Sequence, residues 1–244
     1  MRLRFLLPVL ALAALFFSTF SVVTAQAEQT INCPNDEYDM LDWMTLDSDL
    51  RGSRFMTGNN PEYTMVFPGK FYNVKGPKGY PWDVNLFDDN YIYLWITEYN
   101  WNDPHTYKKF TYNTNMPLAR RCAKGGYPGS TITVNNTWYD LHTDCSHYSR
   151  KNLGYAVNQV WGPYTMNFGG SINYSLQTMV ISYRYNCNSS YSNCGDKEEY
   201  YLTQRYGMVR WAHYRLNGGG YELAQVATFN WLGNGSTSPY FPCF

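Results

Sequence analysis

The stretch EYYLTQRYGMVRWAHY, residues 199–214, combines the side chains needed for acid–base chemistry on a sugar. A polysaccharide lyase uses a cation to neutralise a uronate and a tyrosine or histidine as the base. Both kinds of group are present: Arg205, Arg210, Tyr206, His213 and Tyr214. The alternative is that the aromatic residues fill a core, as strand aromatics usually do, and leave the polar residues to line a groove.

Paired carboxylates are a second catalytic option, that of a glycoside hydrolase. The acids available are Asp83, Asp88, Asp89, Glu98, Glu198, Glu199 and Glu222. Glu98 follows an aliphatic strand face, and burial there would raise the pKa of its carboxyl toward that of a general acid. The alternative is that the strand has reached solvent by Glu98. The catalytic candidates are Glu98, Arg205, Arg210 and His213.

Aromatic residues alternate with aliphatic ones in YIYLWITEY, residues 91–99, which is typical of a strand with two apolar faces. Sugars stack their C–H faces on exposed rings and bind amides and carboxylates through their hydroxyls. The predicted glycan-binding residues are therefore Tyr91, Tyr93, Trp95 and Tyr99, together with Trp211 of the later stretch. The alternative is a second buried layer, because the interior of a sandwich has the same pattern.

Asp140, His142 and Asp144 alternate and would project from one face of a strand toward a metal or a general base. The alternative is a turn approaching Cys145, where Asp and Thr bind backbone groups. No cofactor is predicted, although Ca²⁺ stays an option. The sequence contains no nucleophile elbow, zinc-protease, P-loop or dinucleotide-binding motif.

The N-terminus predicts secretion. Arg2 and Arg4 precede an apolar run that ends before Ala25-Gln26-Ala27, so residues 1–27 are expected to be a cleaved signal peptide. No later segment reaches the length of a membrane span. Cleavage removes two of the 19 basic residues and none of the 19 acidic ones, leaving a net charge of −2. This charge argues against a polyanion partner bound by bulk electrostatics, and no nucleic acid is expected as a partner. Residues 28–244 are expected to form one extracellular domain.

The cysteines follow the signal and are even in number, which predicts three disulfides among Cys33, Cys122, Cys145, Cys187, Cys194 and Cys243. The short polar segment between Cys187 and Cys194 favours a local bond, and Cys33 is then expected to pair with Cys243. Four sequons suit an extracellular glycoprotein: Asn135, Asn173, Asn188 and Asn234.

Period-two patterns separated by glycine and proline clusters predict an antiparallel β-sandwich or jelly roll. The further predicted strands are 63–74, 131–140, 176–185, 199–206, 208–216 and 221–232. One short N-terminal helix is expected over residues 35–52, with Asn35 or Asp36 as its N-cap and Gly52 as its stop.

Residues 199–215 are expected to form a hairpin that turns through Arg205–Met208, with Tyr200, Leu202 and Tyr206 on one face of its first strand. Val209 and Trp211 are expected to share one face of the second strand. The Tyr-Gly-x-Val-x-Trp pattern of this hairpin resembles hairpins of secreted jelly-roll proteins, a resemblance that supports the fold and transfers no site.

The favoured function is therefore non-catalytic binding of a carbohydrate or polysaccharide. One alternative is a polysaccharide-degrading enzyme, either a hydrolase or a lyase. The other is a structural subunit of an extracellular layer or fibre that assembles with copies of itself through strand edges or its C-terminal segment.

Overall fold

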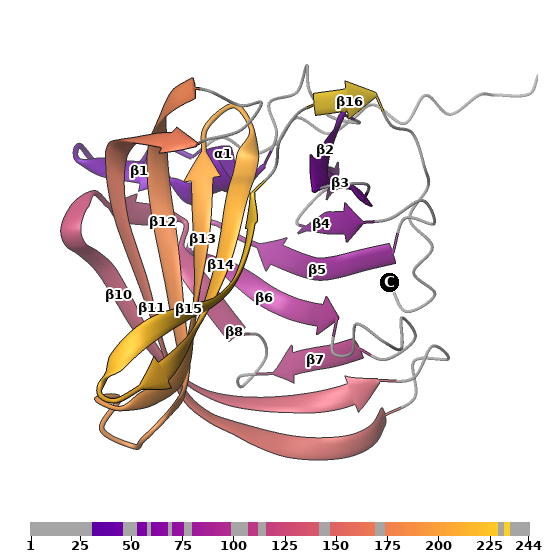
Figure 1. The fold of residues 1–244 in the computed structure, drawn as a ribbon, viewed down its shortest axis with the longest axis vertical. Helices are drawn as coiled ribbons and strands as arrows, with labels where there is room; N and C mark the ends of the chain where they lie inside the picture. The colour runs from indigo at the N-terminus through magenta and orange to yellow at the C-terminus, as the bar shows by residue number, and fades with distance from the viewer. Residues whose placement is uncertain are drawn as a thin grey trace, which may run out of the picture.

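The chain folds almost entirely into antiparallel β-strands in a computed structural model (Figure 1). The structure describes residues 31–45, 53–57, 60–67, 70–75, 80–98, 107–111, 116–141, 147–168, 174–228 and 232–234. Within these ranges, side chains are described for residues 31–45, 85–94, 116–135, 154–168 and 175–228. The predicted signal peptide lies outside the described residues. No helix in the described part of the chain is both long and apolar enough to cross a membrane.

One large sheet contains most of the strands in the order β15-β14-β13-β12-β11-β10-β7-β6-β5-β4-β3-β2-β16. Its first half along the chain is β2(Ser53–Thr57), β3(Asn60–Phe67), β4(Lys70–Lys75), β5(Tyr80–Phe87), β6(Tyr91–Glu98) and β7(Tyr107–Thr111). Its second half is β10(Gly126–Leu141), β11(His147–Phe168), β12(Tyr174–Cys187), β13(Cys194–Thr203), β14(Gly207–Asn217) and β15(Gly220–Thr228). Sequence neighbours pair almost throughout, as the repeated turn signals predict.

Three shorter strands complete the sheets. β8(Met116–Arg120) pairs with β6, and β16(Leu232–Asn234) pairs with β2. β1(Glu37–Asp39) and β9(Cys122–Lys124) form a separate two-stranded sheet. The strand predicted over residues 63–74 is in fact the hairpin of β3 and β4, because Pro68-Gly69 separates two runs that pair with each other.

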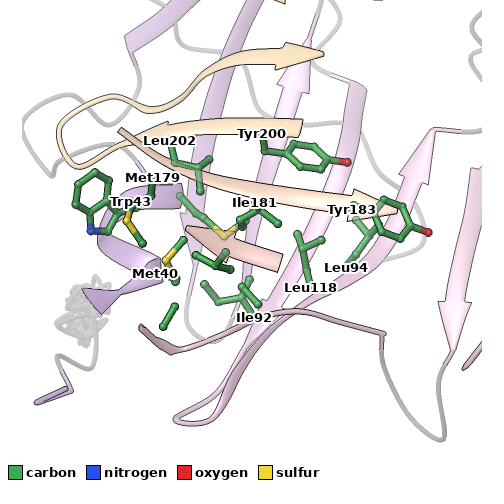
Figure 2. Close-up of a cluster of buried hydrophobic side chains, with 14 of the residues drawn as sticks. Met40, Trp43, Ile92, Leu94, Leu118, Met179, Ile181, Tyr183, Tyr200 and Leu202 are labelled. Atoms are coloured by element: carbon green, nitrogen blue, oxygen red, sulfur yellow. The ribbon is translucent and has the colours of Figure 1, made fainter. Parts of the chain in front are cut away.

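The main hydrophobic core lies between β6 and β8 on one side and β10–β13 on the other (Figure 2). Ile92 and Leu94 are buried from β6, and Ile181 and Leu202 are buried opposite them. The part of the expected aliphatic face that the structure describes, Ile92 and Leu94, is therefore a core face. Each such side chain contributes about 1.5 to 3 kcal/mol by burial.

The helix α1(Met40–Met44) is shorter than predicted and begins later. Its N-cap is Asp39, whose Oδ1 accepts a hydrogen bond from the Leu41 backbone N–H at 3.0 Å. The prediction of Asn35 or Asp36 as the cap was wrong because Glu37–Asp39 pair with β9 and cannot also be helical. Four of the five helix residues are buried in the main core.

A buried ion pair joins this helix to the end of β8. Arg121 is 1% exposed and binds the Asp39 carboxylate through both Nε and Nη2. Its backbone also bridges two segments, since Arg121 N–H donates to Asn90 O and Met40 N–H donates to Arg121 O, each at 2.8 Å. Removing one partner of such a pair costs about 3 to 5 kcal/mol, because the other charge is left buried.

Two disulfides lie within the described residues, which include no free cysteine. Cys187 and Cys194 are bonded as predicted, across the antiparallel pairing of β12 with β13. The predicted bond of Cys33 to Cys243 was wrong, because Cys33 is bonded to Cys122 with a Cα–Cα distance of 5.4 Å. The β1–β9 pairing places Asp39 opposite Cys122, and the turn in which Glu37 N–H donates to Pro34 O at 3.1 Å folds Cys33 back toward it. Cys145 and Cys243 lie outside the described residues.

Candidate functional site

The hairpin of β13 and β14 is present as predicted, but its turn lies at Gln204-Arg205. The turn predicted over Arg205–Met208 was placed too late, because Gly207 and Met208 already pair with Thr203 and Leu202. The side chains of this hairpin project alternately from the two opposite faces of the sheet. The inner face of β10–β14 packs on the main core and carries Tyr200 and Leu202, whereas the outer face carries a second cluster around Val180 and Tyr201.

A β-bulge at Val209 changes which side chains share a face. Tyr201 pairs with Arg210 but Leu202 pairs with Met208, so Val209 is the extra residue. Val209 therefore joins the outer cluster, while Trp211 packs on the inner one. The expectation that these two residues share a face was wrong for this reason, and Tyr206 likewise packs on the outer cluster rather than beside Tyr200.

Glu198 is the centre of a hydrogen-bonded aromatic group on the inner face. Its Oε2 accepts from Tyr200 Oη at 2.8 Å and from Trp211 Nε1 at 3.0 Å. Its Oε1 accepts from Tyr185 Oη at 3.3 Å. One carboxylate thus orients three rings that come from three neighbouring strands, β12, β13 and β14.

Asp196 and His213 extend this group away from the turn, toward the open end of the hairpin. His213 Nε2 lies 3.4 Å from Asp196 Oδ1, and its ring stacks on Trp211 at 6.2 Å between centroids with 22° between planes. The side chains of His213 and Asp196 are 18% and 27% exposed. We call Tyr185, Asp196, Glu198, Trp211 and His213 the Glu198 site.

Tyr185 of the Glu198 site and its neighbour Tyr183 keep their hydroxyl protons. Tyr183 stacks on Tyr185 at 4.8 Å with 26° between planes. Burial, and then the nearby Glu198 carboxylate, raises the pKa of both hydroxyls above the ordinary value of 10.0. Tyr183 and Tyr185 are therefore hydrogen-bond donors at neutral pH.

The chemistry of the Glu198 site is that of a polar aromatic surface. Its rings offer faces for C–H groups, and its carboxylates and imidazole offer hydrogen bonds. Among the described residues, no three His, Cys, Asp or Glu side chains lie close enough to hold a metal ion. Asp196 and Glu198 are two residues apart on one strand and so share a face. The alternation of side chains along a strand could have indicated this shared face from the sequence alone.

The predicted aromatic platform on β6 is only partly within the described side chains. Tyr91 and Tyr93 are half-buried on the face opposite Ile92, with ring centroids 5.9 Å apart. The side chains of Trp95 and Glu98 lie outside the described set, as does Tyr99 altogether.

Tyr93 is tied to the turn before β6. Its hydroxyl donates to Asp88 Oδ2 at 2.8 Å. Burial and this hydrogen bond raise the pKa of Tyr93 to about 12. Burial alone would raise the pKa of Asp88, but hydrogen bonds from the backbone N–H groups of Tyr91 and Asn90 and from Tyr93 lower it overall.

The structure does not bring the catalytic candidates of the hairpin together. His213 faces inward, Arg210 faces outward above the Tyr201 ring, and Arg205 lies in the exposed turn above Tyr206.

The suggested metal residues and the sequons are only partly described. Asp140 lies in β10 but its side chain is not described, and His142 and Asp144 fall outside the described residues. Of the sequon asparagines, Asn135 and Asn188 are exposed, the Asn234 side chain is not described, and Asn173 lies outside.

Comparisons of this chain with protein-family models, with curated proteins and with solved structures found no match.

Proposed function

We propose that this protein is a secreted glycan-binding β-sandwich protein that binds its ligand at the Glu198 site. The observation that carries the proposal is the Glu198 carboxylate, which orients Tyr185, Tyr200 and Trp211 by hydrogen bonds. The two disulfides support the extracellular location, and the core between two parts of the sheet supports the sandwich.

The fixed orientation of the rings favours binding. A ring that is free to rotate loses about 0.5 to 1.5 kcal/mol when a ligand immobilises it. Here Trp211 is already held by its Nε1–Glu198 hydrogen bond and by stacking on His213. Asp196, which is held by Asn186 Nδ2 at 3.2 Å, supplies acceptors for sugar hydroxyls beside these rings.

Replacing Trp211 with Ala tests the proposal. Ligands are first identified on an array of neutral and acidic glycans, and the affinity is then measured by titration calorimetry. Trp211→Ala removes the stacking surface and is expected to cost about 2 kcal/mol, roughly 30-fold in Kd. Trp211→Phe keeps a ring but loses the donor to Glu198, so an intermediate affinity is expected.

Tyr127→Ala is the matched control for these variants. Tyr127 is 81% exposed on β10 and lies outside the Glu198 site, so its replacement should leave the affinity unchanged. An array without any bound glycan, or equal affinity of Trp211→Ala and the unmodified protein, would contradict the proposal.

A glycoside hydrolase is the second candidate, favoured by the shared face of Asp196 and Glu198. Hydrolases of this kind use two carboxyl groups flanking the scissile bond. Release of reducing ends from the bound glycan, abolished in both Asp196→Asn and Glu198→Gln, would identify an enzyme. Binding without turnover identifies a lectin-like protein.

Self-assembly is measured on the same samples by size-exclusion chromatography. β15 exposes Leu223 and Val226 by 51% and 45%, so a structural subunit would be expected to elute as an oligomer. A monomer that binds glycan agrees with the proposed function.

A further inference from the structure

The outer face of the same hairpin carries a strip of cations. Arg184 pairs with Lys197 in register, and Tyr201 pairs with Arg210, so these residues lie on one face of three adjacent strands. Glu199 is the acid between them. Three cations against one carboxylate give this strip a local charge of +2, whereas the whole chain has a formal net charge of +0.

The Lys197 ammonium is held in place by its neighbours. Its Nζ donates to Glu199 Oε1 at 2.8 Å and lies 4.0 Å from the centroid of Tyr214 and 5.2 Å from that of Tyr221. Glu199 Oε2 also accepts from Tyr201 Oη at 2.7 Å. The single carboxylate of the strip is therefore already bound by Lys197 and Tyr201.

One nitrogen of each arginine differs in this respect from the Lys197 ammonium. In the described structure, Nε of Arg184 and Nε of Arg210 are both buried without a hydrogen-bond partner. Arg210 instead lies over the Tyr201 ring at 5.1 Å. A buried donor without an acceptor costs free energy, and an acceptor supplied by a ligand would remove that cost.

We propose that the strip of Arg184, Lys197 and Arg210 binds the oxyanions of an acidic oligosaccharide, as a site separate from the Glu198 site. Arginine binds carboxylate and sulfate groups through paired N–H donors. The register places the two arginines two strands and four residues apart, which is about 16 Å between Cα atoms at ordinary strand spacings. An extended ligand of several sugar units would reach both.

The charge density of the strip favours a saccharide over a nucleic acid. Duplex DNA carries one negative charge for about every 1.7 Å of its axis, and proteins that bind it neutralise many phosphates. A net charge of +2 over about 16 Å is a far lower charge density.

Two tyrosines beside the strip can donate hydrogen bonds. Burial raises the pKa of the Tyr201 and Tyr214 hydroxyls, so they keep the protons that sugar oxygens can accept.

The experiment is calorimetry on the full chain with four probes. These are a tetrasaccharide of uronates, a sulfated neutral tetrasaccharide, an uncharged tetrasaccharide and a single-stranded oligonucleotide, all at constant ionic strength. Arg184→Gln and Arg210→Gln are each expected to weaken binding of a charged saccharide about tenfold, the loss expected for one charge-assisted contact. Comparison of the affinities for the uronate and the sulfated tetrasaccharide shows whether the strip prefers carboxylate or sulfate groups.

Arg215→Gln is the matched control. Arg215 lies on β14 beyond the bulge, pairs with Asp196 of the inner face and is exposed, so its loss removes the same charge without touching the strip. Unchanged affinity in this variant, with thermal melts of all variants near that of the unmodified chain, supports the proposal. Equal weakening by Arg215→Gln, equal binding of the uncharged saccharide, or tighter binding of the oligonucleotide would overturn it. The outcome is independent of Trp211→Ala, which reports on the other face.

Discussion

Glu198 and Glu199 are adjacent in the chain and face opposite sides of the sheet. Glu198 accepts from Tyr185, Tyr200 and Trp211 on the inner face, and Glu199 accepts from Lys197 and Tyr201 on the outer face. The alternation of a strand thus gives one hairpin two different surfaces. These two surfaces are the ones that we propose for neutral sugar rings and for oxyanions.

Buried hydroxyls give the tyrosines a measurable pH signature. Burial is the main cause that raises the pKa values of Tyr183, Tyr185 and Tyr201, and that of Tyr93 to about 12. A pKa that is higher in the folded than in the unfolded chain stabilises the fold fully below pH 10, and this contribution is lost as the pH rises above 10. We expect part of the tyrosine absorbance change at 295 nm to appear only above pH 10, together with unfolding.

The control for this titration is the chain in guanidinium chloride, where all tyrosines should ionise near pH 10. If the folded protein showed the same single midpoint and kept its circular dichroism spectrum, the buried hydroxyl network would be refuted.

At the scale of the element, the turn between β13 and β14 fits against the helix α1. Gly207 has φ of 61°, and a Cβ there would meet Met44 O at 3.1 Å and Thr45 C at 3.2 Å. Two features favour glycine at position 207, its positive φ and the close approach of the end of α1. This contact links the hairpin to the element that closes the core.

Two alanine substitutions separate these requirements. Gly218, in the next turn, has φ of 58° but nothing within 4 Å of its Cβ position. Gly218→Ala should destabilise the protein by about 1 kcal/mol, the cost of a left-handed residue with a side chain. Gly207→Ala should cost roughly 1 to 3 kcal/mol more, because α1 must also move. Urea unfolding measures both, and equal losses would contradict the contact.

At the scale of the whole molecule, the two disulfides that the structure describes close loops of very different length. Cys33 and Cys122 are 89 residues apart, whereas Cys187 and Cys194 are 7 apart. The longer loop ties the segment before α1 to β9 and so holds the helix on the core. The shorter loop only closes the connection between β12 and β13.

Serine substitutions of each cysteine pair should therefore differ in effect. Because a crosslink restricts the unfolded chain more when its loop is longer, loss of the Cys33–Cys122 bond should cost about 4.5 kcal/mol and loss of the Cys187–Cys194 bond about 2.5 kcal/mol. Chemical denaturation of both double variants measures the difference. A larger loss for the short loop would show that strain or local packing, and not chain entropy, dominates.

Local sequence patterns predicted several strands, a hairpin and one disulfide of this protein. The alternation in residues 91–99 predicted a strand, of whose aliphatic face Ile92 and Leu94 are buried. The glycine in residues 199–215 predicted the hairpin. The Cys187–Cys194 bond was predictable from its short loop. All three depend on residues close together in the chain, where period and turn chemistry are decisive.

Only the tertiary structure decided the partner of Cys33, the start of α1 at Met40 and the face of Trp211. The first two follow from pairing of β1 with β9, segments more than 80 residues apart whose contact no local pattern encodes. The third follows from one extra residue at Val209, since a shift of one residue moves a side chain to the opposite face. The Glu198 site depends on that shift, because without it the Trp211 ring would face away from Glu198.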